Sequence, residues 1–462
     1  MLGELRERMR KQLRAEEVGA VGQLAAQANL TAADRAAISD RAAALVRAVR
    51  SGGAPTMMES FLGEYGLSTS EGVALMCLAE AMLRVPDAET IDDLIQDKIV
   101  PHDWAAHVGD SGSLMVNAST WALMLTGQML DDREGGVVAT LRGMVRRLGE
   151  PVIRTAVTRT MQEMGNQFVL GRTINEAIKR ADRMIAKGYR YSFDMLGEAA
   201  LTVDDADRYH ASYANAIGRL AEHGRNSGMH DSTGISVKLS ALHPRYEFAQ
   251  RARAVPELAA RTLELARAAR DAGMGFNIDA EEADRLDTSL DVIEQVLRDP
   301  SLEGWDGFGV VVQAYGPRAH AVIDWLHALA TELDRRIMVR LVKGAYWDTE
   351  IKKAQVMGLD GFPVFTRKIH TDISYLACAR KLLDARDRIY PQFATHNAHT
   401  AAAVLHLAGE ERNGFEFQRL HGMGERLHDI LKTESGVPCR IYAPVGAHRD
   451  LLAYLVRRLL EN

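Results

Sequence analysis

The regular alternation of short apolar runs with long amphipathic segments, beginning near Tyr189, is the feature that most constrains the fold of this chain. Runs rich in β-branched or aromatic residues have the length of strands. They are Tyr191–Leu196, Ile235–Ala241, Gly275–Ala280, Phe308–Tyr315, Ile337–Lys343, Gln392–Asn397, Phe415–His421 and Arg440–Val445. Helical periodicity between them marks Val255–Ala272, Ser289–Arg298, Arg318–Leu333, Tyr375–Ala385 and Ala401–Gly409. Alternating strands and helices are typical of a parallel sheet.

Eight strand–helix repeats within about 270 residues predict a (βα)8 barrel, and an open doubly wound sheet is the alternative. Polar residues at or just after the ends of nearly all predicted strands favour the barrel, because barrel enzymes build their sites at that rim. These residues are Asp194 and Glu198, Lys238, Asp279, Gln313, Arg340 with Lys343, His396 with Asn397, Gln418 with His421, and Tyr442. We therefore predict an active site at the C-terminal mouth.

The first 180 residues or so are Ala-rich, and apolar residues recur there at helical spacing. Thr31 and Ser70 are suitable N-cap residues. The predicted helices are Thr31–Val49, Ser70–Arg84, Glu89–Ile99, Ser111–Leu130 and Val137–Leu148. This half offers no catalytic constellation, so we expect a helical scaffold. The predicted organisation is an N-terminal helical arm and α-domain over 1–180, followed by the barrel over 181–462.

Composition excludes several classes of protein. The chain has 56 Lys and Arg against 62 Asp and Glu, a net charge of -6, which argues against a nucleic-acid footprint over the whole surface. Cys77, Cys378 and Cys439 lie far apart, as expected for reduced thiols in a cytosol. No stretch approaches the roughly 18 apolar residues of a membrane span, and the charged N-terminus lacks a signal peptide's apolar core. We expect a soluble cytoplasmic protein and leave peripheral docking on the inner membrane open.

Familiar cofactor and metal motifs are missing from the sequence. It contains no GxGxxG after a strand, no GxxxxGK[ST] and no HExxH. His396, His399, His406 and His421 lack a carboxylate pair at ligand-like spacing, so we predict no metal.

Basic residues gather around the fifth predicted strand. Arg340, Lys343, Arg367 and Lys368 are accompanied by small or hydroxyl-bearing residues and by two aromatic side chains, Gly344, Ala345, Thr366, Tyr346 and Trp347. Such charges combine with backbone N–H groups in phosphate recognition, and aromatic faces can pack on a flat ring. The pattern favours a pyrophosphate-bearing cofactor, although Arg367 and Lys368 taken alone are more typical of a solvated surface.

The chain ends in a strongly amphipathic segment, LLAYLVRRLLEN, which carries adjacent Arg457 and Arg458. Tandem arginines on a terminal helix are usually solvated. If this helix covered the barrel mouth, they would instead form a bidentate clamp for a carboxylate, with Lys238 as a third positive group. Periodicity leaves the two arrangements open.

Seven ordered motifs resemble those of one known family, the proline dehydrogenase domain of the bacterial proline utilization A (PutA) proteins. The motifs read ISVKLSALHPRYE, FNIDAEEADR, VRLVKGAYWD, YPQFATHNAHT, LHGMGE, RIYAPVG and YLVRRLLEN. The resemblance covers about Tyr189 to Asn462 closely and extends more weakly through the helical region before it.

This resemblance implies a distorted (βα)8 TIM barrel with an N-terminal all-helical domain, noncovalently bound FAD, and a last helix over the mouth. It also implies oxidation of L-proline to Δ1-pyrroline-5-carboxylate by hydride transfer to flavin N5, with electrons passing on to a membrane quinone.

The resemblance further implies roles for individual residues. Arg457, Arg458 and Lys238 would bind the proline carboxylate, with Glu198 paired to an arginine of this clamp. Asp279 would lie near the substrate amine and the flavin, and Tyr442 and Tyr454 would wall the proline ring. Contacts to the cofactor are implied for Asp279, Gln313, Arg340, Val342, Lys343, Gly344, Ala345, Tyr346, Trp347, Thr366, Arg367, Lys368, Thr395, His396, Asn397, Gln418, Leu420 and Glu461.

Two other readings compete. A Schiff-base barrel would use Lys238 or Lys343 as a nucleophile toward a carbonyl substrate. A non-catalytic interaction module would have a neutral rim, which the many ionisable residues oppose. Family members continue into an aldehyde dehydrogenase domain, and some begin with a ribbon-helix-helix segment. Neither is recognisable here, so we expect a monofunctional or trimmed form without a nucleic-acid partner.

Overall fold

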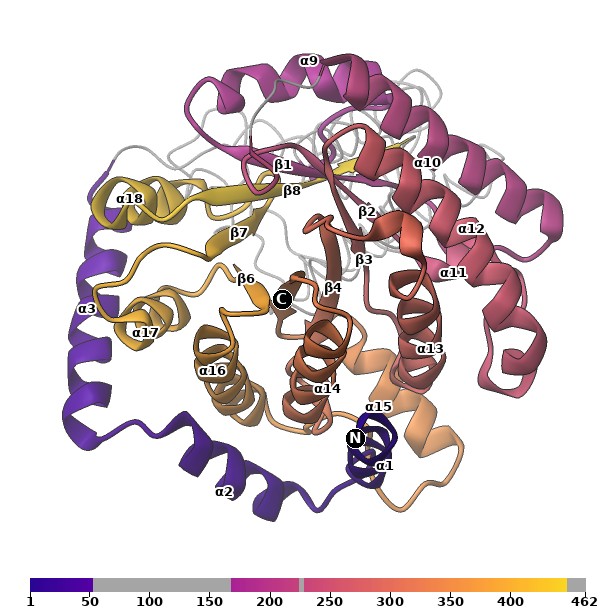
Figure 1. Ribbon diagram of the computed structural model, residues 1–462. Coiled ribbons are helices and arrows are strands. Elements are labelled where there is room, and N and C mark those ends of the chain that lie inside the picture. Colours follow the sequence, from indigo (N-terminus) through magenta and orange to yellow (C-terminus); the bar gives the residue numbers. More distant parts are fainter. Residues whose placement is uncertain (53–167, 224–227, 447–462) are drawn as a thin grey trace, which may run out of the picture. The chain divides into compact units, whose positions relative to one another are not determined.

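The computed structural model describes residues 1–52, 168–223 and 228–446. Residues 1–51 and 169–446 form one compact unit, built around eight parallel strands that close into a barrel in sequence order (Figure 1). The strands are β1 (Arg190–Met195), β2 (Gly234–Val237), β3 (Gly275–Ile278), β4 (Phe308–Gln313), β5 (Ile337–Val342), β6 (Ile389–Ala394), β7 (Glu416–Leu420) and β8 (Cys439–Val445). The predicted α/β barrel is confirmed.

Helices enclose the barrel on the outside (Figure 1). They are α9 (Ile174–Ile185), α10 (Val203–His223), α11 (Leu239–Leu242), α12 (Arg251–Asp271), α13 (Leu286–Leu297), α14 (Ala319–Glu332), α15 (Trp347–Val356), α16 (Lys368–Asp384), α17 (Ala398–Ala408) and α18 (Glu425–Ser435). Short 3₁₀ turns, η2 (Phe248–Gln250), η3 (Ala283–Arg285) and η4 (Pro300–Leu302), lie between them.

Alternation along each strand separates an apolar outer face from the barrel interior. In β4, Val310 and Val312 belong to the large apolar cluster beneath the helices, whereas Gln313 bonds to groups at the mouth. In β1, Tyr191 and Phe193 lie in the same cluster, and Ser192 and Asp194 bond across the interior. The interior of this barrel is therefore largely polar.

Strand β6 begins three residues before the predicted run. The difference has a physical reason, because β6 runs through Pro391, and proline is unusual inside a sheet since it cannot donate a ladder hydrogen bond. Pro391 nevertheless pairs in register with Val339 of β5.

The N-terminal helices wrap around the helical layer (Figure 1). They are α1 (Leu2–Lys11), α2 (Glu17–Ala28) and α3 (Ala32–Arg50), which contact α14, α16, and α17 with α18, respectively. Thr31 accepts from the backbone of Asp34 in a capping box, so the predicted N-cap is confirmed. The predicted helices between Ser70 and Leu148 lie outside the described residues.

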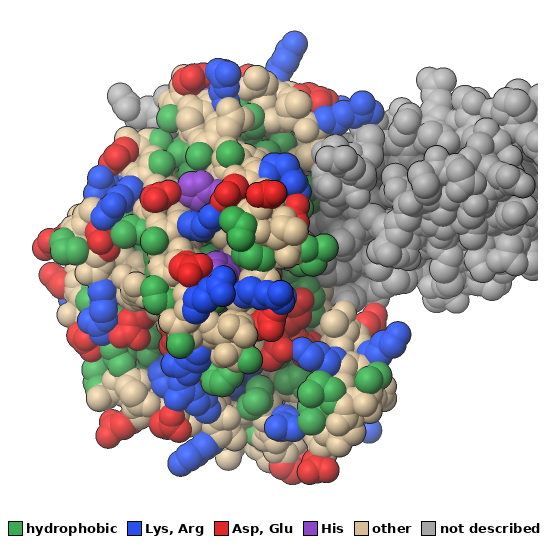
Figure 2. All heavy atoms as spheres, turned by 90° about the vertical axis from the view of Figure 1, so that its right-hand side faces the viewer, with side chains coloured by type: hydrophobic (Ala, Val, Ile, Leu, Met, Phe, Trp, Pro, Cys, Tyr) green, Lys and Arg blue, Asp and Glu red, His purple; other side chains and the backbone are tan. Residues whose placement is uncertain are grey.

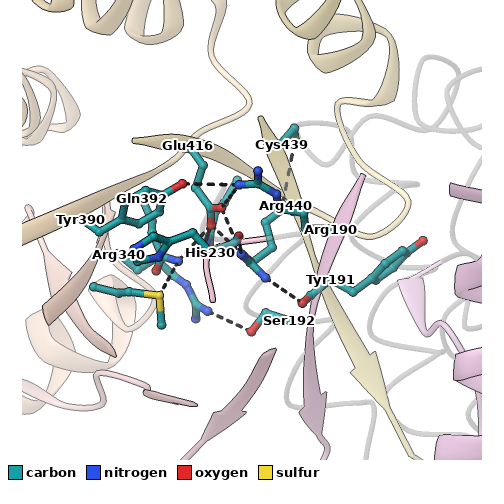
Figure 3. A network of polar contacts seen from close by, with 12 residues as sticks. Arg190, Tyr191, Ser192, His230, Arg340, Tyr390, Gln392, Glu416, Cys439 and Arg440 are labelled. Atoms are coloured by element: carbon teal, nitrogen blue, oxygen red, sulfur yellow. Dashed lines mark hydrogen bonds and ion pairs between the residues drawn. The ribbon is translucent and has the colours of Figure 1, made fainter. Parts of the chain in front are cut away.

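Buried charges close the N-terminal end of the barrel (Figure 3). The Glu416 carboxylate accepts hydrogen bonds from Arg440 Nε at 2.7 Å and from Arg190 Nη1 at 3.2 Å. Gln392 Nε2 also donates to Glu416 at 2.9 Å. Burial raises the pKa of Glu416, but Arg440 and Arg190 outweigh it and hold that pKa below its usual value.

Two surface properties bear on the expectations above. On the face shown in Figure 2, Lys and Arg are interspersed with Asp and Glu, so this face carries no basic stripe. Among the helices within the described ranges, none is long and apolar enough to cross a membrane.

Cys378 and Cys439 are buried free thiols, and Cys77 lies outside the described residues.

We expect Glu416→Ala to lower the free energy of unfolding by about 3 to 5 kcal/mol, because it leaves two arginines in the interior without their carboxylate. Urea denaturation followed by circular dichroism measures this change. The matched control is Glu411→Ala, which removes an exposed ion pair with Arg386 and should cost less than about 1 kcal/mol. Equal losses in the two variants would contradict the assignment.

Candidate active site

Two carboxylates and two cations meet inside the C-terminal mouth of the barrel. Lys238 directly follows β2, and its Nζ donates to both oxygens of Asp194 at 2.8 and 2.9 Å. The same Nζ lies 3.4 Å from Asp279 Oδ2, just after β3. Parallel strands present their carboxyl ends at one rim, so residues distant in sequence converge here.

Arg340 reaches across the interior from β5 to join this group. Its Nη1 donates to Asp279 Oδ1 at 2.9 Å, and its guanidinium lies 5.0 Å from the centre of the Tyr442 ring. Tyr442 in turn donates its hydroxyl to Asp279 Oδ2 at 2.7 Å. Asp194, Asp279, Lys238 and Arg340 therefore balance in formal charge.

These contacts hold both the lysine and the phenol in their protonated forms. Burial lowers the pKa of Lys238, but Asp194, followed by Tyr442 and Asp279, outweighs burial and raises that pKa well above its ordinary value. Burial, with Asp194 and Asp279, raises the pKa of Tyr442 well above its usual range. Lys238 is thus a fixed positive charge at the mouth.

A second buried network supports the rim beside Asp279. Glu281 accepts from the Ser240 backbone at 3.0 Å and pairs with Arg285 at 3.1 Å. Gln313 Nε2 donates to the Glu281 carbonyl oxygen at 2.8 Å, and Gln313 Oε1 accepts from the Ala345 backbone at 3.0 Å. A cavity of about 50 Å³ lies here, lined in part by Asp279, Glu281 and Gln313.

The last residue of β5, Val342, and the segment that follows it to Ala345 are half-buried. Gly344 has a φ of +158°, and a Cβ there would overlap the Tyr315 ring, so glycine is needed for this packing. Tyr346 is buried, and the indole of Trp347 donates to the Phe365 carbonyl oxygen at 2.8 Å.

The predicted phosphate-binding residues are brought together by acidic partners. Asp372 accepts from Lys343 at 2.5 Å and from Lys368 at 2.8 Å. Burial lowers the pKa of Lys343 despite this ion pair. Thr366 donates its backbone N–H and its hydroxyl to Glu17 of α2, at 2.9 and 2.8 Å. Arg367 is the N-cap residue of α16.

The predicted residues after β6 and in β7 are linked by hydrogen bonds to neighbouring groups. Thr395 Oγ1 accepts from the Asn397 backbone at 3.1 Å, and Asn397 caps α17 through Thr400 at 2.9 Å. His396 Nε2 accepts from the Leu420 backbone at 3.0 Å. Gln418 lies deeper in the barrel, where its Nε2 donates to Glu416 at 2.9 Å.

Buried polar atoms of two predicted cofactor-contacting residues lack a hydrogen-bond partner among the described residues. They are Nε of Arg340 and Oε1 of Gln418. Buried polar groups are nearly always satisfied, so such atoms commonly mark a place where a bound group contributes the missing partner.

Several predicted residues cannot be placed. Tyr454, Arg457, Arg458 and Glu461 lie outside the described residues, so the clamp stays a prediction. Glu198 is half-buried in the loop after β1. Within the described part of the chain, no group of His, Cys, Asp or Glu is arranged to hold a metal ion.

Sequence reasoning missed Ser192, Ser236, Glu281 and Asp372. Ser192 and Ser236 each precede a recognised rim residue by two positions, so strand alternation places them one layer deeper on the interior face. That spacing was a usable signal. Glu281 follows Asp279 at the same spacing, whereas Asp372 is one turn into a helix and carries no such mark.

The chain belongs to the proline dehydrogenase family, because residues 177–462 match the family described as proline dehydrogenase. Residues 4–50 match the proline utilization A proline dehydrogenase N-terminal domain. Residues 57–168 match a family described as the DNA-binding domain of proline dehydrogenase, and all but the last of them lie outside the described ranges. The resemblance predicted from the motifs is confirmed.

Individual relatives agree with this assignment. The chain is 54% identical to bifunctional protein PutA of Klebsiella aerogenes over 88% of its length and 32% of that protein. It is 52% identical to PutA of Rhizobium meliloti over 93% of its length and 35% of that protein. A crystal structure of proline utilization A from Bradyrhizobium japonicum is 51% identical, with a TM-score of 0.73, and the match covers 97% of this chain and 45% of that one. The chain thus spans about a third of the curated relatives.

The pH dependence of stability tests the Glu281 network. Burial raises the pKa of Glu281 to about 7 from an ordinary 4.5. Between these values the folded protein keeps a proton that the unfolded chain releases, so this group destabilises the fold as pH rises toward 7. We expect Glu281→Gln to remove a pH-dependent loss in the free energy of unfolding on the order of 3 kcal/mol.

Urea unfolding at pH 5 and pH 8 of both proteins measures this difference. The exposed Glu247→Gln substitution is the control, and it should follow the unsubstituted protein at both pH values. A Glu281→Gln variant with the same pH dependence as the unsubstituted protein would show that Glu281 ionises normally.

Proposed function

We propose that this chain is an FAD-dependent proline dehydrogenase that oxidises L-proline to Δ1-pyrroline-5-carboxylate. The observation that carries the proposal is the charge-balanced cluster of Lys238, Asp194, Asp279 and Arg340 at the mouth of a barrel from the proline dehydrogenase family. The cluster offers fixed positive charge for a carboxylate and a buried guanidinium for a polar ring.

The residues present fit FAD. The unpartnered Nε of Arg340 can donate to an acceptor atom of a flat ring, and the unpartnered Oε1 of Gln418 can accept from another part of the cofactor. The half-buried segment from Val342 to Ala345, with Gly344 in it, allows close approach to that ring. Lys343 and Lys368 supply positive charge for a pyrophosphate, although Asp372 now pairs with both. A bound phosphate at Thr366 would compete with Glu17 for the same donors.

In this proposal the cofactor contacts are those implied by the family resemblance. Gln313, Arg340 and the 342–347 segment hold the ring. The remaining groups surround the ribityl, pyrophosphate and adenosine parts, namely Thr366, Arg367, Lys368, Thr395, His396, Asn397, Gln418, Leu420 and Glu461.

Substrate binding relies on positive charge from two parts of the chain. Arg457 and Arg458 clamp the proline carboxylate, with Glu198 paired to one of them, and Lys238 contributes its third N–H. That N–H makes the long 3.4 Å contact to Asp279 Oδ2. A substrate carboxylate can take the place of Asp279 as the acceptor. Tyr442 and Tyr454 wall the ring of the substrate.

The proposed reaction removes two electrons and two protons from L-proline. When bound, FAD supplies the acceptor for a hydride from the carbon beside nitrogen. The amine must be unprotonated at that moment, and no histidine of the matched set is an obvious base. The positive clamp lowers the pKa of the nearby amine, so its proton can leave to water. Asp279 and the clamp then hold the substrate in line with its acceptor.

The family resemblance also implies an electron acceptor, a location and a domain organisation for this chain. We propose that the electrons pass to a membrane quinone, and that the protein is cytoplasmic with peripheral contact at the inner membrane. We also propose that residues 1–180 form an arm and α-domain and that residues 181–462 form the barrel. The part of the chain that carries the site would release pyrroline-5-carboxylate without oxidising it onward.

The charge state of Lys238 opposes a Schiff-base enzyme. An amine nucleophile must be neutral, and the carboxylates around Lys238 raise its pKa well above the ordinary value. Lys343, whose pKa burial lowers, is paired with Asp372. Borohydride should therefore trap no covalent adduct.

An absorbance spectrum tests the cofactor and the substrate together. We expect the purified protein to show flavin bands, and the band near the visible maximum to bleach when L-proline is added without oxygen. D-proline serves as the matched control, since the clamp and Asp279 together orient only the L-enantiomer for reaction. A colourless protein, or flavin that L-proline leaves oxidised, would refute the proposal.

Arg458→Met tests the carboxylate clamp. Loss of one charge-assisted hydrogen-bonding partner should raise the KM for L-proline roughly tenfold to a hundredfold. Arg388→Met, which removes a surface ion pair with Asp334, is the control and should leave the KM unchanged. If Arg458→Met binds proline as tightly as the unsubstituted protein, the clamp is wrong.

A further inference from the structure

Two buried serines hold the far end of the Arg340 guanidinium. Arg340 Nη2 donates to Ser236 Oγ at 3.0 Å and to Ser192 Oγ at 3.2 Å. The two hydroxyls also contact each other at 3.0 Å. Both serines are buried, on the neighbouring strands β1 and β2. Figure 3 shows the contact between Ser192 and Arg340, which extends from β5.

The serine pair determines where the guanidinium charge can lie. Nη1 is held by Asp279, and the two N–H groups of Nη2 are held by the serines, so the planar group is fixed on two edges. Nε alone is left without a partner among the described residues. An arginine side chain has many rotamers, and a short anchor at its end removes most of that freedom.

Hydroxyls suit this position for a physical reason. A carboxylate in place of either serine would neutralise Arg340 a second time, because Asp279 already pairs with it. Serine accepts the hydrogen bonds and adds no charge, so Asp279 remains the carboxylate that pairs with the guanidinium. Its small volume also leaves room for the arginine to cross the barrel interior.

We propose that Ser192 and Ser236 are positioning residues that orient Arg340 toward the redox ring bound at the mouth and thereby raise the reduction potential of that ring. This inference rests on the proposed FAD site. A positive charge held close to the ring stabilises the reduced, more negative form. A guanidinium that is free to swing away stabilises it less.

The test is the double variant Ser192→Ala, Ser236→Ala, together with each single variant. We expect the midpoint potential of the bound flavin, measured by reductive titration against a reference dye, to become more negative in the double variant. The rate of flavin reduction by L-proline should fall roughly tenfold to a hundredfold. Each single variant leaves Nη2 one acceptor, so the single effects should be small and their sum should fall short of the double effect.

Two controls separate this inference from a structural role and from the proposed function. Ser374→Ala removes another buried serine, on α16, and should leave the potential unchanged. Arg340→Met removes the charge itself and should lower the potential at least as far as the double variant. If Arg340→Met leaves the potential unchanged, the proposed role of Arg340 fails, whatever the serines do.

A different result would refute the role of the serines while leaving the role of Arg340 intact. It is overturned if Arg340→Met lowers the potential while the double serine variant keeps the native value, or if that variant loses only thermal stability and flavin content. Should the double variant fail to fold, the single variants decide, because either must then move the potential in the same direction or refute the proposal.

Discussion

Neutralising charge inside a closed barrel is the constraint on which the rest of this structure depends. An ion in a low-dielectric interior is strongly destabilising unless it is paired and hydrogen-bonded. The barrel meets this requirement at two levels. Glu416 lies between Arg190 and Arg440 near the N-terminal end. Asp194 and Asp279 balance Lys238 and Arg340 at the mouth. Because both clusters draw on strands distant in sequence, they form only once the barrel closes.

The same pairing prepares the mouth for chemistry. Charges held by the fold need no reorganisation when a ligand arrives, which is the basis of electrostatic preorganisation. Lys238 stays protonated because its partners raise its pKa, and Arg340 is fixed by Asp279 on one edge and by two serines on the other. Nε of Arg340 and Oε1 of Gln418 remain without a hydrogen-bond partner among the described residues. Stability and function here use the same residues.

Much of the architecture could be predicted, and the misses have identifiable causes. The eight strands and their order follow from apolar runs whose alternation survives in the structure, as Val310 and Val312 of β4 illustrate. The start of β6 was placed too late because Pro391 interrupts the strand pattern. Lys238, Asp279 and Arg340 are predictable because polar residues recur at the ends of nearly all strands, where barrel enzymes build their sites. Ser192 and Ser236 were overlooked because serine in a buried strand is commonplace, and only their shared partner distinguishes them.

The sequence by itself determined the class of fold, the family and the residue types gathered at the rim, because these are written in local periodicity and in ordered motifs. Only the tertiary structure decided which charges pair. Asp372 joins Lys343 to Lys368, and Glu17 of the N-terminal arm takes the donors of Thr366 that were predicted to bind phosphate. Pairings of this kind depend on separations of a few ångströms between segments far apart in the chain, and no local pattern encodes such distances.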